Sequence, residues 1–397
     1  MSYARFDSDD SGRATSRWAC MASSTPLQLR CDPPNYVTRL RSASDVVREW
    51  RDPLAALSWL STEGRAEHWR GWISYDLGRW FETLPATAND DLRLPLFVFT
   101  THDSITPHTD DSAALGAATP RDASAGICST LTRDAYHRAV TRALDYIAAG
   151  DVFQVNLAQR FSAPTALSPP AIYERLRSHA PATFGACLVY DDFSLISNSP
   201  ELFLRVAPDR RVITRPIKGT RPRGPGMQDE LRRSAKDQAE LAMIVDLERN
   251  DLGRVCEVGS VRVTEPRAIE AHPTVYHGVA TIDGVLRRDV TFVDLLRATF
   301  PGGSITGAPK IRAMEIIEEL EPVRRGPYCG AIGYLAADGS MEFNIAIRTM
   351  IVKDGLVHIP VGGGIVADSK PEDEYEETLV KAKAMFDALG LVIQSSL

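Results

Sequence analysis

Ten residues, 215–224, combine one lysine, three arginines, two prolines and two glycines. Lys218 lies between Ile217 and Gly219 in this segment. A lysine in an apolar setting among other cations has a lowered pKa and can act as a nucleophile. Gly219 lets the backbone approach a ligand closely. A basic loop in solvent is the commoner role of such a segment, and these ten residues alone leave both interpretations open.

Carboxylates are a second group of candidates. Glu201 follows Pro200 and precedes an apolar run, 202–204. A carboxyl that is partly buried there would have a raised pKa and could serve as a general acid. Considered alone, Glu201 is more commonly a charge at the edge of a strand.

Two predicted helices each present a pair of carboxylates, because side chains three residues apart lie on one helix face. The first pair is Asp237 and Glu240, and the second is Glu374 and Glu377, with Lys381 four residues further along the same face. Such hard oxygen ligands suit Mg²⁺. Acidic pairs are common on helices, so each pair by itself is weak evidence for a metal site.

Three consecutive glycines, Gly362, Gly363 and Gly364, predict a loop whose free backbone N–H groups could hold an anion. The segment has neither the Lys-Ser/Thr of a P-loop nor the spacing of a dinucleotide-binding turn. Arg348 falls in a predicted strand, where an arginine that points inward requires a carboxylate partner. His277 by default is a structural histidine.

The totals restrict the class of protein. The chain has 397 residues and a net charge of −7, with an isoelectric point of about 5.7. This charge gives no general attraction to nucleic acid or to an anionic membrane. No apolar run is long enough to span a membrane, and the acidic N-terminus is not a secretory signal. Six scattered cysteines without a Cys-x-x-Cys pair fit a reducing cytosol. We therefore expect a cytoplasmic enzyme.

Strands outnumber helices in the predicted elements and often follow one another directly, which favours an α+β fold with antiparallel sheets. Residues 1–100 are expected to contribute strands, 101–130 to form a flexible linker or surface loop, and 131–397 to form the catalytic region. The principal predicted elements are a strand with a turn in 70–82, a helix from Thr132 to Gly150, a strand at 152–161, a hairpin of 184–190 and 194–206, a helix at 228–248, and strands at 328–335, 341–352 and 357–361.

Six sequence runs, in this order, resemble the chorismate-binding enzymes. They are Ser-Pro-Glu at 199–201, Pro-Ile-Lys-Gly-Thr-Arg at 216–221, Ser-Ala-Lys-Asp-Gln-Ala-Glu at 234–240, Asp-Leu-Glu-Arg-Asn-Asp-Leu-Gly-Arg at 246–254, Gly-Ala-Pro-Lys at 307–310, and 362–368 with the helix that follows. The runs at 75–79 and 81–82 extend the resemblance to most of the chain. It implies two stacked antiparallel sheets flanked by helices, with the active site between the sheets.

The resemblance also implies roles for individual residues. Lys218, Glu201 and His277 would form the catalytic group, with His277 and Ser304 lining the ring of the substrate. Mg²⁺ would be bound by Glu240 and Glu377, with Asp237 and Glu374 close by, and would hold the ring carboxylate. The remaining substrate-binding residues would be Gly219, Thr220, Tyr328, Arg348, Gly362, Gly363, Gly364 and Lys381.

Lys218 also discriminates within the family. Aminodeoxychorismate synthases have lysine at this position and anthranilate synthases have alanine. Isochorismate and salicylate synthases have a lysine base where this chain has Gln154. The resemblance thus implies amination of chorismate at C4 through a lysine-linked intermediate, with ammonia from a separate glutamine amidotransferase subunit. Anthranilate synthase and a non-catalytic scaffold for that subunit are the alternatives. Whether the product serves folate or secondary metabolism stays open.

Some features depart from the family. Residues 1–35 match no known segment, and the Leu-Leu-Glu-Ser run of feedback-regulated anthranilate synthases is absent from the sequence. Asp237 stands where many relatives have glutamate, which could change how the metal is held.

Overall fold

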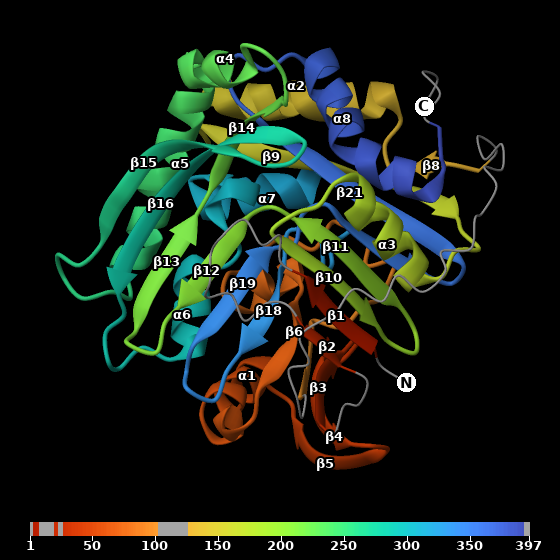
Figure 1. Ribbon diagram of the computed structural model, residues 1–397, viewed down its shortest axis with the longest axis vertical. Coiled ribbons are helices and arrows are strands. Elements are labelled where there is room, and N and C mark those ends of the chain that lie inside the picture. The colour runs from red at the N-terminus through yellow and green to blue at the C-terminus, as the bar shows by residue number, and fades with distance from the viewer. Residues whose placement is uncertain (1–2, 8–19, 23–26, 102–125, 393–397) are drawn as a thin grey trace.

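The computed structural model describes residues 3–7, 20–22, 27–101 and 126–392. Within them, two antiparallel sheets stack against each other, and helices cover their outer faces (Figure 1). This arrangement confirms the expected α+β fold. Most of the expected linker at 101–130 and much of the unmatched segment 1–35 lie outside the described residues.

In the part of the chain that the structure describes, the smaller sheet has nine strands. Their order is β17 (Gly307–Ala308), β9 (Gln154–Pro164), β21 (Leu356–Ile365), β20 (Thr349–Lys353), β11 (Ser194–Ser199), β10 (Phe184–Val189), β1 (Tyr3–Asp7) and β2 (Cys20–Ala22), and β8 (Cys128–Ser129) also pairs with β9.

The larger sheet has twelve strands within the same described ranges. Their order is β14 (Ile217–Pro222), β16 (Val275–Val285), β13 (Arg211–Arg215), β12 (Leu202–Val206), β19 (Met341–Ile345), β18 (Ala331–Leu335), β6 (Trp69–Ile73), β7 (Phe97–Thr101), β3 (Leu27–Asp32), β4 (Val37–Ser42) and β5 (Asp45–Trp50), and β15 (Arg262–Ala271) pairs with β16. Strands from the first hundred residues therefore join both sheets.

Apolar residues of both sheets meet in the core between them, among them Trp72, Val98, Leu195 and Ile332. The outer helices are α1 (Pro53–Ser61), α2 (Arg133–Ala149), α3 (Pro169–His179), α4 (Met227–Arg233), α5 (Ala235–Gly253), α6 (Phe292–Thr299), α7 (Lys310–Leu320) and α8 (Pro371–Leu389). Helices α3 and α8 share a core with the smaller sheet, and α1, α5 and α6 share one with the larger sheet.

Local sequence signals predicted both ends of α2 correctly. Thr132 caps α2 by accepting a hydrogen bond from the N–H of Ala135, and Gly150 ends it in the left-handed conformation (φ 82°). This confirms both predicted ends. The helix predicted at 228–248 is wrong as one element, since it is divided at Ser234. The Ser234 side chain caps α5 by accepting from the N–H of Asp237, and α4 ends at the residue before it.

Two predicted strands are each split between the sheets. The second arm of the expected hairpin, 194–206, is β11 in the smaller sheet followed by β12 in the larger one, with the crossing at Pro200 and Glu201. The strand expected at 341–352 is likewise β19 in the larger sheet and β20 in the smaller one. Because β11 pairs with β20 and β12 with β19, the two strands cross side by side.

Hydrogen bonds join the two crossings. The Ser199 hydroxyl donates to the carbonyl oxygen of Ile345 (2.6 Å) and accepts from the N–H of Glu201 (3.3 Å). The N–H of Ile345 donates to the carbonyl oxygen of Glu201 (3.0 Å). The crossings therefore hold each other in place.

Ser199→Ala tests this link. The change leaves a buried carbonyl and N–H without their hydroxyl partner, so we expect the free energy of unfolding to fall by about 1–3 kcal/mol in urea titrations. The matched control is Ser178→Ala, because Ser178 is an exposed residue whose hydroxyl bonds only within and beside α3. A loss no larger than in this control would contradict the role of Ser199.

Candidate active site

Glu201 is placed by the first crossing. Its side chain is buried, and its Oε1 accepts a hydrogen bond from the N–H of Ile217 (3.4 Å). Burial raises the pKa of this carboxyl, while nearby Ser304 and Lys218 oppose the rise. The structure therefore places Glu201 where a carboxyl can retain a proton, as the general-acid prediction requires.

Lys218 lies on β14 at a break in the pairing with β16, between Ile217 and Thr220. Gly219 adopts φ 84°, and a Cβ atom there would lie 2.8 Å from Cγ of Asp237. Only glycine therefore fits this bulge, and the bulge sets the orientation of the neighbouring Lys218. Burial lowers the pKa of the Lys218 ammonium, with Glu240 acting in the opposite direction. The lowered pKa increases the fraction of neutral amine, the form that attacks carbon.

Thr220 and His277 face each other across β14 and β16. The Thr220 hydroxyl lies 2.8 Å from Nδ1 of His277. Burial lowers the pKa of His277 to about 3, and the charges of His272 and Arg348 add to this effect. His277 is therefore neutral near pH 7, so in this setting it can position groups but does not act as an imidazolium acid.

The glycine run is a strand and not the predicted loop, because Gly362, Gly363 and Gly364 lie in β21 and pair with β9. Gly362 is opposite Ala158, whose N–H donates to Glu321, and Gly364 is opposite Asn156, whose N–H donates to Thr306. These are therefore the non-hydrogen-bonded pairs of the ladder, and the N–H groups of both glycines point away from β9.

The opposite edge of β21 is open at this level. Strand β20 pairs with β21 only between Lys353–Leu356 and Ile351–His358, and then departs toward the larger sheet. The second crossing thus leaves the N–H edge of the glycines uncovered. The predicted anion-binding function of these groups is compatible with strand geometry, although their setting is a strand edge.

Arg348 lies in this second crossing, so the prediction that it falls in a strand is wrong. Its backbone has φ 52°, and its side chain is half-buried. The expected carboxylate partner is not found: among residues 27–101 and 126–392, no side-chain carboxylate forms an ion pair with Arg348. The charge of Arg348 lowers the pKa of His277. Burial lowers the pKa of Arg348 itself, and Tyr328 is close enough to act in the opposite direction. Arg348 is therefore a cation available to an anionic ligand.

Glu374, Glu377 and Lys381 meet above Gly363. A Cβ atom on Gly363 would lie 3.3 Å from Oε2 of Glu374, 3.4 Å from Oε1 of Glu377 and 3.6 Å from Nζ of Lys381. Lys381 is 2.6 Å from Oε1 of Glu377 and donates to the carbonyl oxygen of Gly362 (2.8 Å). Burial works to raise the pKa of Glu377, but Lys381 holds it below its usual value.

The acidic residues suit a cation only in part. Oε2 of Glu374 is buried and has no hydrogen-bond partner among the described residues. Glu377 is close enough to Glu240 for its charge to raise the pKa of Glu240. Asp237 instead lies 3.2 Å from Nη2 of Arg221. No three His, Cys, Asp or Glu side chains in the described ranges form a group that could hold a metal. Two carboxylates with water suffice for Mg²⁺, so Glu377 together with Glu240, as predicted, or with Glu374 would supply enough ligands for this ion.

Gln154 completes the group. Its amide is buried, and neither polar atom has a hydrogen-bond partner within the described residues. A Cβ atom on Gly364 would lie 2.9 Å from Nε2 of Gln154 and 3.3 Å from Nζ of Lys218. The amide of Gln154 and the amine of Lys218 therefore meet at the same glycine.

Sequence reasoning missed two buried groups. Arg325 donates to both carboxylate oxygens of Glu321 and to the carbonyl oxygens of Ile305 (2.9 Å) and Asn156 (2.8 Å). Glu321 also accepts from the N–H of Ala158 (2.9 Å). This cluster ties β9 to the segment that carries Tyr328. Glu321 and Arg325 are four residues apart, but the backbone groups that they bind on β9 are distant in the chain, so no sequence motif marked the cluster.

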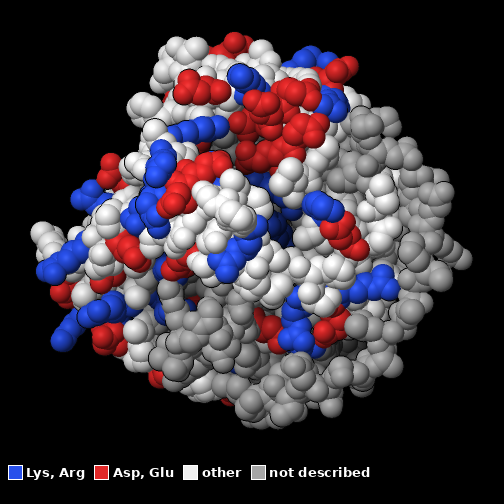
Figure 2. Space-filling model, turned by 45° about the horizontal axis from the view of Figure 1, so that its top comes forward, with Lys and Arg blue, Asp and Glu red and all other residues white. Residues whose placement is uncertain are grey.

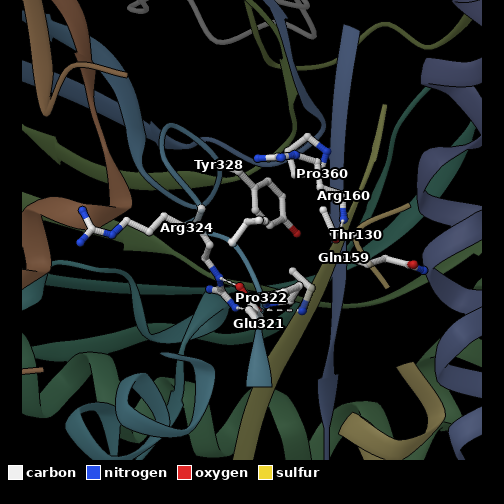
Figure 3. Close-up of a pocket in the computed structure, with 11 residues that line it drawn as sticks. Thr130, Gln159, Arg160, Glu321, Pro322, Arg324, Tyr328 and Pro360 are labelled. Atoms are coloured by element: carbon white, nitrogen blue, oxygen red, sulfur yellow. Dashed lines mark hydrogen bonds and ion pairs between the residues drawn. The ribbon is translucent and has the colours of Figure 1, made fainter. Parts of the chain in front are cut away.

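A small cavity of about 20 Å³ lies beside this cluster, with room for about one water molecule. Figure 3 shows the ring of Tyr328 in it, with Glu321 below the ring and Arg324 pointing away. Tyr328 is buried and burial raises its pKa well above the usual value. The phenol therefore remains protonated and can donate a hydrogen bond.

The second missed residue is Glu248 on α5. It is buried, and its Oε2 accepts a hydrogen bond from the Thr214 hydroxyl (2.9 Å). Burial first, and the neighbouring charge of Glu201 next, raise its pKa to about 8. Glu248 falls within the family-like run at 246–254, but nothing in that run predicted its burial.

The predicted residues thus gather in one region, although their individual roles remain predictions. Acidic side chains cluster on the end of the molecule that carries α2, α4 and α8, next to basic ones (Figure 2). No helix among the described residues has the length and hydropathy needed to cross a membrane.

Residues 18–387 match the family that is described as chorismate binding enzyme. This chain belongs to that family. Among curated relatives, it is 44% identical over 356 residues to anthranilate synthase component 1 of Thermus thermophilus, covering 81% of this chain and 77% of the relative. It is 38% identical over 404 residues to aminodeoxychorismate synthase component 1 of Bacillus subtilis, covering 89% and 86%.

A solved structure of the family supports the fold. Anthranilate synthase component I from Streptococcus pneumoniae superimposes with a TM-score of 0.79 at 30% identity and covers 96% of this chain and 95% of that one. The two activities thus occur among relatives of comparable identity, and the family as a whole does not decide between them.

Arg348→Gln tests the free cation. The variant removes a half-buried charge that has no carboxylate partner, so we expect the free energy of unfolding to stay within about 1 kcal/mol of wild type. Loss of a charged hydrogen bond should raise the dissociation constant for chorismate about 10- to 100-fold by calorimetry. Arg249→Gln, at an exposed position on α5, is the matched control. Unchanged chorismate affinity would exclude the anion-binding role.

Glu248→Gln tests the buried carboxyl. Native Glu248 keeps its proton to about pH 8, against an ordinary value of 4.5, so the native state binds more protons than the unfolded state between these values. The free energy of unfolding therefore falls as pH rises through this range. In Glu248→Gln we expect this fall to be smaller than in wild type, by on the order of 4 kcal/mol. In the exposed control Glu257→Gln we expect the same fall as in wild type. Equal slopes in all three proteins would show that Glu248 titrates normally.

Proposed function

We propose that this chain is component I of an aminodeoxychorismate synthase, which converts chorismate and ammonia to 4-amino-4-deoxychorismate and water. The observation that carries the proposal is the position of Lys218. Its amine reaches the glycine edge of β21 beside Gln154, and it is close enough to Glu201 for each charge to affect the pKa of the other. A lysine and a proton-bearing carboxyl so placed suit covalent substitution on a small polar ring.

Chorismate carries two carboxylates, and the site offers two regions for them. Arg348, the phenol of Tyr328 and the N–H groups of Gly362 and Gly364 suit the enolpyruvyl carboxylate. The ring carboxylate faces the acidic side, where Glu374 and Glu377, with Glu240 nearby, would hold Mg²⁺. When bound, this ion would neutralise the charge of the ring carboxylate. The ring then lies beside Ser304 and neutral His277.

In the first step, the neutral amine of Lys218 forms a bond to C2 of the ring. Both ring double bonds shift, and the C4–oxygen bond breaks as Glu201 gives its proton to the departing hydroxyl, which leaves as water. The new ammonium of Lys218 then returns a proton to the Glu201 carboxylate. One difficult substitution is thereby divided into two easier ones.

In the second step, ammonia forms a bond to C4, both double bonds shift back, and the C2–nitrogen bond breaks. Glu201 protonates the departing amine of Lys218, and the new C4 ammonium returns the proton to Glu201. Protons and electrons balance, and both residues regain their starting states. Ammonia would come from a separate glutamine amidotransferase subunit.

Anthranilate synthase is the second candidate, because a relative of that name is 44% identical to this chain. That activity aminates C2 and releases pyruvate. The two proposals separate on the product, so we would incubate the chain with chorismate, ammonium and Mg²⁺ and analyse the mixture by mass spectrometry. We expect a product that retains the enolpyruvyl group. Anthranilate together with pyruvate would overturn the proposal.

Lys218→Ala removes the proposed nucleophile. We expect the rate of amination to fall about a thousand-fold or more while chorismate still binds, because the lysine acts in the chemical step. Lys383→Ala is the matched control, since Lys383 is 72% exposed and pairs with Asp387 on the outside of α8. Full amination by Lys218→Ala would exclude the covalent route, and anthranilate formation by this variant would show that Lys218 selects the product.

A further inference from the structure

Glu248 is a buried ionisable group that the proposed reaction leaves unused. It lies on α5, and its Oε2 accepts from the hydroxyl of Thr214 on β13 (2.9 Å). The charges that face it come from Glu201 at the crossing, Asp251 on its own helix and Lys310 on α7. Lys310 is 2.5 Å from Oδ2 of Asp251 and donates to the carbonyl oxygen of Thr299. Lys310 is thus already neutralised by Asp251, and Glu248 is left facing Glu201.

The two carboxyls are connected through one short segment. A Cβ atom on Gly303 would lie 3.5 Å from Cγ of Glu248, and the next residue, Ser304, places its hydroxyl close to Glu201. The Ser304 hydroxyl is buried and forms no hydrogen bond with any of the described residues. Gly303 therefore lies beside Glu248 and Ser304 lies near Glu201, which places Glu248 behind the acid of the candidate active site.

We propose that Glu201 and Glu248 form a proton-sharing pair, in which Glu248 is a positioning residue that keeps a proton available to Glu201. Two buried carboxyls in electrostatic contact do not both ionise near neutral pH, so the pair retains one proton. The proposal rests on the role of Glu201 as the acid of the proposed function. It adds a function for Glu248, since Glu201 gives and regains a proton in both steps of that reaction.

The burial of the pair predicts a defined pH profile. Burial and the charge of Glu201 raise the pKa of Glu248 to about 8, so the pair loses its last proton near that pH. In Glu248→Gln, Glu201 titrates alone, and its proton leaves at lower pH. In Thr214→Val, the hydroxyl that stabilises ionised Glu248 is lost, and the last proton leaves at higher pH.

The test measures the rate of chorismate consumption by the full chain with ammonium and Mg²⁺ from pH 6 to 9. The alkaline midpoint should fall by at least about one pH unit in Glu248→Gln, which lowers the rate at pH 8 at least about five-fold relative to wild type. The midpoint should rise in Thr214→Val. Ionisation of ammonia affects all variants equally and cancels in the comparison. If Glu248→Gln does not fold, the direction of the Thr214→Val shift decides the proposal.

Midpoints that do not move in Glu248→Gln and Thr214→Val would overturn the proposal, as would an equal loss of rate at every pH, which would indicate a purely structural role. Failure of the proposed function is recognised separately. Chorismate consumption that yields anthranilate would reject aminodeoxychorismate synthesis, while the midpoints would still show whether the two carboxyls share a proton.

Discussion

Two neighbouring strands must cross between the sheets at the same level, and the site depends on this constraint. Strands β11 and β12 cross at Pro200, and β19 and β20 cross beside them, because each half of one strand pairs with a half of the other. The hydroxyl and backbone bonds among Ser199, Glu201 and Ile345 hold the crossings together. A crossing interrupts regular pairing, and this interruption frees backbone and side-chain positions for a ligand.

Each crossing positions one candidate site residue, Glu201 in the first and Arg348 in the second. The departure of β20 also uncovers the edge of β21, where the N–H groups of Gly362 and Gly364 point outward. The same irregularity therefore places an acid, a cation and two N–H donors. A continuous sheet would have hydrogen-bonded these backbone groups to a neighbouring strand.

Buried charge is distributed unevenly around the site. Arg325 is fully satisfied by Glu321 and two carbonyl oxygens, and this cluster is structural. Both amide atoms of Gln154 and Oε2 of Glu374 are buried and have no such partners within the described residues. Unsatisfied buried polar groups are unfavourable in a folded protein, and the glycine edge is one of several places among the described residues where such groups occur.

The sequence by itself determined the chemical inventory and most local structure. The motifs indicated the family. The sequence also indicated Lys218, Glu201, Arg348 and the glycines as candidate site residues. Capping signals at Thr132 and Gly150 fixed helix ends because such signals act within one turn. Tertiary structure alone decided that 194–206 and 341–352 each divide between two sheets, that the glycine run is a strand edge, and that Glu248 lies behind Glu201. These features depend on which strands pair and on which side chains from distant segments become buried together, and local sequence patterns do not encode either property.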